Sequence, residues 1–149
     1  MSQPQIVLCS PVRTAIGTYN GTLRNTPATE LGAAAARESL RRSGLDADKV
    51  QTAVFGHVVQ AGAKMNPARR AAIGGGLGVQ VPALTVNRVC GSGAQAVVSA
   101  ALGILAGNLQ CALAGGMENM DMACRPWRRR EGDRASPMAD RSEAQSPGG

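Results

Sequence analysis

Aromatic residues are almost absent from the sequence, which contains one Trp, one Tyr and one Phe among 149 residues. A hydrophobic core must therefore be built from Ala, Val, Leu, Ile and Met, with 19 glycines permitting close backbone contacts. Metal-binding patterns are lacking too, because the four cysteines share no C-x-x-C spacing and there is one histidine. We therefore expect no structural metal site.

Long hydrophobic runs are also missing. The N-terminus, "MSQPQIVLCSPVRT", has a four-residue apolar run without a basic region before it, so we expect no signal peptide and no membrane partner. Reduced thiols in a cytoplasmic protein follow as the expectation. The net charge is +6, but six of the sixteen Lys and Arg residues fall after Ala123 and the others are scattered. The charge therefore does not indicate a nucleic-acid surface before that point.

Residues 124–149 contain no Val, Ile, Leu, Phe or Tyr. A segment with so little to bury is expected to be a disordered, Arg-rich tail, separate from a domain that spans residues 1–123. Two interpretations stay open. The tail is either a basic nucleic-acid-binding extension or the out-of-frame translation of a GC-rich gene.

Short apolar runs and helix-like segments alternate before the tail. Strands are expected at 5–10, 49–59, 82–89 and 109–116. Helices are expected at 26–45, with Thr26 as its cap and Gly44 at its end, at 66–78, with Asn66 as its cap, and at 91–106. The alternation predicts an α/β fold with a mostly parallel sheet.

Cys90 lies where the third strand gives way to the third helix, in "TVNRVCGSGAQAVV". The stretch from Gly91 to Ala106 has no charged residue, and a helix that is apolar on every side is typical of a protein interior. We therefore expect the sheet to be arranged around a buried helix. The N-terminus of such a helix carries unpaired N–H groups and a partial positive charge, which stabilise a thiolate.

The glycines after Cys90 strengthen its candidacy as a nucleophile. Gly91 and Gly93 let a substrate approach the backbone, and N–H groups at the turn can hold a developing oxyanion. Two alternatives stay open. Cys90 is an inert core cysteine, or "GSGAQA" is a dinucleotide-binding fingerprint. The fingerprint needs an acidic residue about 20 positions on, whereas Glu118 lies 25 residues beyond Gly93.

From about Ile6 to Ala123 the sequence resembles the N-terminal half of the thiolases, the acyl-CoA C-acyltransferases. The motifs are "SPVRTAIG", "ELGAAAARESLRRSGL", "GHVVQAG", "NPARRAA" and, most specifically, "NRVCGSGAQAV" followed by "AGGMENM". The resemblance implies a thiolase fold and acyl transfer between acyl-CoA and CoA or acetyl-CoA, by thiolytic cleavage or Claisen condensation in fatty acid metabolism. It also implies CoA thioesters as substrates, no tightly bound cofactor and a homo-oligomer.

The resemblance implies roles for particular residues. Cys90 is the nucleophile that forms an acyl-thioester, and its backbone N–H lines an oxyanion hole. Glu118 supports the site from behind, while Asn66 and Arg69 lie in a segment near subunit contacts. His57 is not the base in this family and sits within a strand pattern, so we expect a structural role for it. Cys9 and Cys111 are expected in core strands.

Thiolases carry a second half that supplies a histidine of Gly-His-Pro, an asparagine of Asn-Glu-Ala-Phe and a second catalytic cysteine. None of these motifs occurs here. We therefore expect a truncated thiolase with little or no turnover and with an exposed apolar surface. The abrupt change after Ala123 favours the out-of-frame interpretation of the tail.

Overall fold

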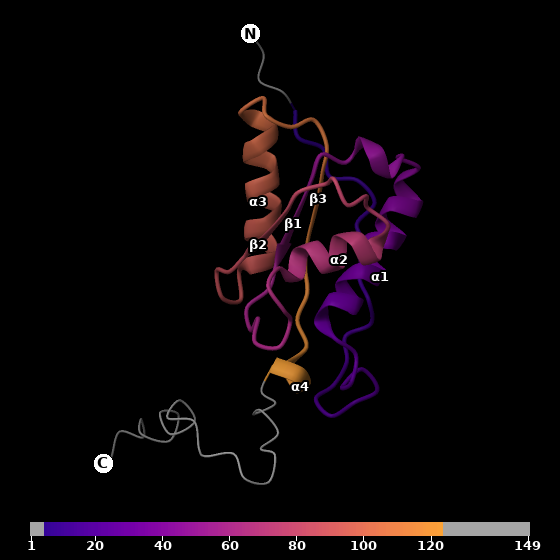
Figure 1. Cartoon of the computed structure of the whole chain (residues 1–149), viewed down its shortest axis with the longest axis vertical. Coiled ribbons are helices and arrows are strands. Elements are labelled where there is room, and N and C mark those ends of the chain that lie inside the picture. The colour runs from indigo at the N-terminus through magenta and orange to yellow at the C-terminus, as the bar shows by residue number, and fades with distance from the viewer. Residues whose placement is uncertain (1–4, 124–149) are drawn as a thin grey trace, which may run out of the picture.

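The computed structural model describes residues 5–123, and the expected tail at 124–149 lies outside the described residues. The described part forms a sheet of three parallel strands in the order β2-β1-β3 (Figure 1). Its elements are α1 (Ala28–Ser43), a 3-10 turn (Ala47–Lys49), β1 (Thr52–Gly56), α2 (Pro67–Gly75), β2 (Ala83–Val86), α3 (Ser92–Leu105), β3 (Ala112–Gly116) and α4 (Met120–Ala123).

The helices cover the two faces of this sheet, with α3 on one side and α1 and α2 on the other (Figure 1). Side chains of β1 alternate between the two layers. Ala53 and Phe55 belong to the larger core with α1 and α2, whereas Val54 packs with Ala96 and Ala100 of α3. The predicted α/β fold with a parallel sheet and alternating helices is therefore confirmed.

Helix boundaries follow the sequence signals with one exception. Asn66 caps α2, since its Oδ1 accepts a hydrogen bond of 3.1 Å from the N–H of Arg69, and α1 ends at Gly44 in the left-handed conformation. The predicted cap at Thr26 is wrong, because the N-cap of α1 is Pro27, one residue later, and the helix has no side-chain cap. The carbonyl of Thr26 instead accepts a 2.7 Å hydrogen bond from Nδ2 of Asn119.

The predicted strand at 5–10 is wrong. This segment forms no strand in the described structure, Val7 and Leu8 are each 73% exposed, and Cys9 is exposed rather than in a core. A β-branched apolar run becomes a strand only where a neighbouring strand pairs with it and a layer covers it, and residues 5–123 provide neither for this run. Cys111 agrees better with its prediction, because it directly precedes β3 and packs, half-buried, against the larger core.

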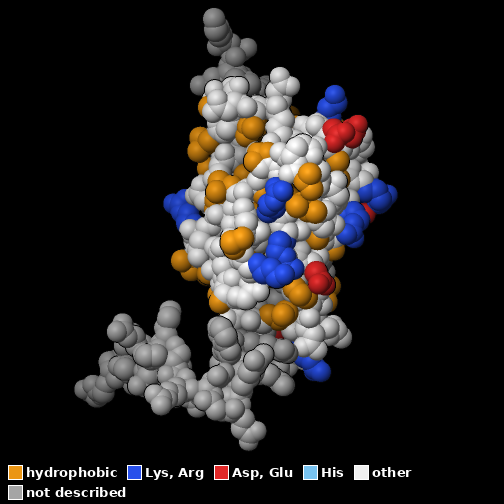
Figure 2. Space-filling view, viewed as in Figure 1, with side chains coloured by type: hydrophobic (Ala, Val, Ile, Leu, Met, Phe, Trp, Pro, Cys, Tyr) orange, Lys and Arg blue, Asp and Glu red, His pale blue; other side chains and the backbone are white. Residues whose placement is uncertain are grey.

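The expectation that α3 is buried on every side is also wrong for the described residues. Only the face toward the sheet is covered. Val98, Leu102 and Leu105 on the other faces are 48%, 57% and 45% exposed. In Figure 2, hydrophobic side chains accordingly lie at the surface along the side of the molecule where α3 runs. The expected exposed apolar surface is therefore present.

Candidate active site

The carboxyl ends of the parallel strands meet the start of α3. β1 and β3 end in glycines, and a Cβ atom added to Gly56 would lie 2.6 Å from the backbone nitrogen of Gly93. One added to Gly116 would lie 3.0 Å from the Cα of Gly93. Gly56 has no room for a side chain, and a side chain at Gly116 would require the backbone of Gly93 to shift by a few tenths of an ångström. The first turn of α3 therefore rests directly on the backbone of the strand ends.

Residues 87–91 form the elbow between β2 and α3. Within it Val89 has φ 49°, a left-handed conformation that is strained for a β-branched residue. Oδ1 of Asn87 accepts a 3.0 Å hydrogen bond from the Val89 N–H. Oγ of Ser92 donates to the Val89 carbonyl at 2.6 Å and accepts from the Arg88 N–H at 2.8 Å. Side chains on both sides of Val89 thus hold the elbow.

Cys90 follows Val89 and immediately precedes Gly91, the N-cap of α3, and its side chain is exposed. The predicted junction of strand, cysteine and helix start is therefore present. The N–H groups of Gly91 and Ser92 donate to the carbonyls of Arg88 and Val89, at 3.1 and 3.0 Å. Because these two N–H groups are used within the turn, fewer backbone donors remain for an oxyanion.

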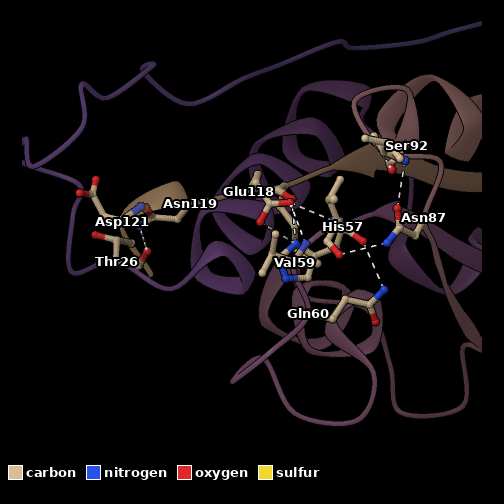
Figure 3. A network of polar contacts seen from close by, with 12 residues as sticks. Thr26, His57, Val59, Gln60, Asn87, Ser92, Glu118, Asn119 and Asp121 are labelled. Atoms are coloured by element: carbon tan, nitrogen blue, oxygen red, sulfur yellow. Dashed lines mark hydrogen bonds and ion pairs between the residues drawn. The ribbon is translucent and has the colours of Figure 1, made fainter. Parts of the chain in front are cut away.

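Glu118 lies just beyond β3 and reaches across to the segment after β1 (Figure 3). Its Oε2 accepts hydrogen bonds from the N–H groups of Val58 at 2.9 Å and Val59 at 3.3 Å. The other oxygen, Oε1, is buried and has no hydrogen-bond partner among the described residues. A dinucleotide site would need this carboxylate for a ribose hydroxyl, whereas Oε2 is already committed to two backbone groups.

His57 stands beside that carboxylate and is 2% exposed. Its Nδ1 lies 3.1 Å from the carbonyl oxygen of Met117 and 3.3 Å from Oε1 of Glu118. Because both neighbours are acceptors, we assign the ring proton to Nδ1. Its Nε2 is buried without a partner among the described residues. These contacts join β1 to β3 and agree with a structural role.

Asn66 and Arg69 bond to β2 and to the loop that precedes it. Asn66 donates through Nδ2 to the Ala83 carbonyl at 2.9 Å, and Arg69 donates to the carbonyls of Val79 and Val81 at 2.9 and 3.3 Å. They therefore tie α2 to β2 and to the loop before it. Their predicted place near a subunit contact stays a prediction.

Within residues 5–123, no group of three or more His, Cys, Asp or Glu residues is placed to hold a metal ion. None of the helices in this part combines the length and apolar content needed to cross a membrane.

The sequence and the fold of this chain are both similar to those of known proteins. The family described as "Thiolase, N-terminal domain" matches residues 6–140. The chain belongs to the thiolase family. Its fold agrees, since the crystal structure of the Bacillus anthracis acetyl-CoA acetyltransferase superposes with a TM-score of 0.71 at 37% identity, over 74% of this chain and 28% of that one.

Curated relatives of this thiolase chain point the same way. An acetyl-CoA acetyltransferase of Cupriavidus necator is 47% identical over 118 residues, which cover 79% of this chain and 30% of the relative. The beta-ketothiolase BktB of the same organism is 48% identical over 120 residues, 80% of this chain and 30% of the relative. The chain thus spans about 30% of the length of these relatives.

Three residues around the elbow were missed in the sequence, namely Asn87, Ser92 and Gly56. A signal existed for the first, because asparagine readily bonds the backbone N–H two residues on, as Asn87 does with Val89. No such indication existed in the sequence for Gly56. A side chain is excluded there because the start of α3 lies against it, and α3 is distant in the sequence.

Proposed function

We propose that this chain carries the acyl-accepting part of a thiolase. The thiolate of Cys90 attacks the carbonyl carbon of an acyl-CoA thioester, the carbon–sulfur bond to CoA breaks, and the CoA thiolate leaves and takes up a proton. In the condensing direction the acyl group then passes to an acetyl-CoA carbanion. In the thiolytic direction the thiolate instead attacks the 3-keto carbon of a 3-ketoacyl-CoA, the bond between C2 and C3 breaks, the departing acetyl-CoA carbanion takes up a proton, and the acyl group passes to CoA. The observation that carries this proposal is the exposed Cys90 thiol directly before the N-cap of α3.

The surrounding residues have supporting roles in this proposal. Gly91 leaves the backbone beside Cys90 accessible to the thioester, Gly93 lets the start of α3 lie against the strand ends, and the N–H of Cys90 donates to the developing oxyanion. Glu118 fixes the strand ends behind the elbow through its bonds to Val58 and Val59. The substrates are CoA thioesters, and the reaction needs no tightly bound cofactor. The protein acts in cytoplasmic fatty acid metabolism. The segment around Asn66 and Arg69 lies near a contact between subunits of a homo-oligomer.

We further propose that these 149 residues alone turn over slowly or not at all. Their one histidine, His57, is 2% exposed and its Nδ1 faces Met117 and Glu118, so it is poorly placed to take the Cys90 proton. A positioned general base typically contributes about 10²–10⁴-fold, and that contribution is missing. Acyl capture therefore has to be tested separately from turnover.

Alkylation with iodoacetamide near neutral pH, followed by peptide mapping, tests the activated thiol. Cys9 is an internal control in the same chain, because it is exposed as Cys90 is but precedes no helix. We expect the Cys90 peptide to be modified first. Modification of Cys9 or Cys111 ahead of Cys90 would count against the proposal.

A further inference from the structure

Asn87 connects the strand ends to the elbow that carries Cys90. Its Nδ2 donates a 3.0 Å hydrogen bond to the Val58 carbonyl, and its Oδ1 accepts a 3.0 Å bond from the Val89 N–H. In Figure 3 its side chain lies between Ser92, at the start of α3, and the group around His57. One amide side chain thus joins the segment after β1 to the residue next to Cys90.

The residue that Asn87 holds is the strained one. A non-glycine residue in the left-handed region persists only where its surroundings determine its conformation, and Val89 has φ 49°. Asn87 fixes the N–H of Val89, and Ser92 fixes its carbonyl. Because Cys90 comes next in the chain, the direction of its side chain depends on this backbone conformation.

The anchor on the other side of Asn87 is itself held. The N–H of Val58 donates to Oε2 of Glu118, and the carbonyl of Val58 accepts from Asn87. The bonds therefore run from Glu118 through Val58 and Asn87 to Val89. Through these bonds Glu118 supports the conformation of the elbow.

We propose that Asn87 is a positioning residue that keeps Val89 left-handed and thereby aims the Cys90 thiol outward at the start of α3. The proposal rests on the proposed function of Cys90 as the acyl acceptor. Asn87 itself contacts no acyl group in this scheme and acts only through the backbone of Val89.

A double-mutant cycle on the full 149-residue chain tests this role. The readout is the ratio of the iodoacetamide alkylation rates of Cys90 and Cys9, measured in the native chain, Asn87→Ala, Val89→Gly and the double variant. We expect Asn87→Ala to lower the ratio by about tenfold. Without Asn87 the strained Val89 relaxes to another conformation, and the strain at one such residue corresponds to about a tenfold change in population. Since glycine adopts the left-handed conformation without strain, we expect Asn87→Ala to lower the ratio by less than about threefold in the Val89→Gly background.

Gln60→Ala is the matched control. This amide also donates to the segment after β1, at the His57 carbonyl (3.2 Å), but has no bond to Val89. We expect its ratio to equal that of the native chain. An Asn87→Ala ratio equal to that of Gln60→Ala, or an equal fall in the Val89→Gly background, overturns the proposal.

Circular dichroism shows whether each variant is folded. Should Asn87→Ala unfold, Asn87→Ser decides instead, because a serine hydroxyl can accept a hydrogen bond from the backbone N–H two residues on and adds no charge near Cys90. We expect it to keep more than half of the native ratio, and a fall to the reactivity of Cys9 overturns the proposal. Failure of the proposed function is distinguishable: Cys90 of the native chain would then take no acyl group from acetyl-CoA, while its alkylation still depended on Asn87.

Discussion

The carboxylate of Glu118 accepts a hydrogen bond of 2.9 Å from the backbone N–H of Val58. Glu118 follows β3 and Val58 follows β1, so the bond clamps the carboxyl ends of two adjacent parallel strands. The elbow with Cys90 and the start of α3 contact these strand ends. Rigid strand ends behind an exposed nucleophile keep it in position without covering it.

Removing this clamp is expected to lower stability. Glu118→Ala leaves the part-buried N–H groups of Val58 and Val59 without an acceptor, which costs about 1–3 kcal/mol in the free energy of unfolding. Glu118→Gln keeps a carbonyl oxygen in place and is expected to cost less. Urea denaturation measures both, and an alanine variant as stable as the native chain would contradict the clamp.

Two glycines near the elbow are expected to differ in their tolerance of alanine. Gly56→Ala places a Cβ atom against the backbone of Ser92 and Gly93, and such overpacking costs about 1–3 kcal/mol. Gly93→Ala meets its nearest atom at 3.9 Å, an ordinary contact, and alanine favours the helix. Thermal unfolding should therefore show a clear loss for Gly56→Ala and none for Gly93→Ala. Equal losses would mean that α3 does not rest on β1 as described.

The exposed face of α3 is expected to drive self-association rather than folding. Leu102→Gln with Leu105→Lys removes apolar side chains that are 57% and 45% exposed, so thermal stability should change little. Sedimentation velocity and binding of an apolar dye should both show less association. Ala100→Gln is the control on the covered face, where the residue is 6% exposed, and there we expect a loss of stability instead.

Glu38 gives α1 a pH-dependent contribution to stability. Hydrogen bonds from Arg41 and Arg42 lower the pKa of Glu38 from its usual 4.5 to about 2. Because the pKa is lower in the folded state, the stabilisation is present above about pH 4.5 and is lost as the pH falls toward 2. The effect is small, since these side chains are exposed to solvent.

Glu38→Gln should therefore lower Tm slightly at pH 7, and the difference from the native chain should shrink between pH 4.5 and 2. Thermal melts across this range measure it. A difference that stays constant with pH would mean that the two arginines contribute nothing through the charge of Glu38.

Much of the fold could be predicted from the sequence because its signals are local. The cap at Asn66, the glycine at position 44 and the apolar strands at β1, β2 and β3 each depend on a few neighbouring residues. The segment at 5–10 shows the limit, because an apolar run cannot report whether a partner strand is present. The same holds for α3, whose composition indicates burial but not which faces are covered.

The site was predictable only in part, for a related reason. Cys90 could be identified because the helix that follows it is adjacent in the sequence. The bonds from Asn87 to Val58 and from Glu118 to Val58 join residues 29 and 60 positions apart. Such contacts depend on the order of the strands in the sheet. The left-handed conformation of Val89 could not be predicted from the residue type, because a valine normally indicates a strand.

Acyl capture by the full chain tests the central claim most directly. The chain is incubated with acetyl-CoA, and peptide mapping by mass spectrometry locates the acetyl group, with Cys90→Ala as the control. The account predicts one acetyl group on Cys90, none on Cys9, which is also exposed, and none on the control. Acetylation of Cys9 to the same extent, or an unlabelled Cys90 that still alkylates faster than Cys9, would contradict the claim that the start of α3 is built to accept an acyl group.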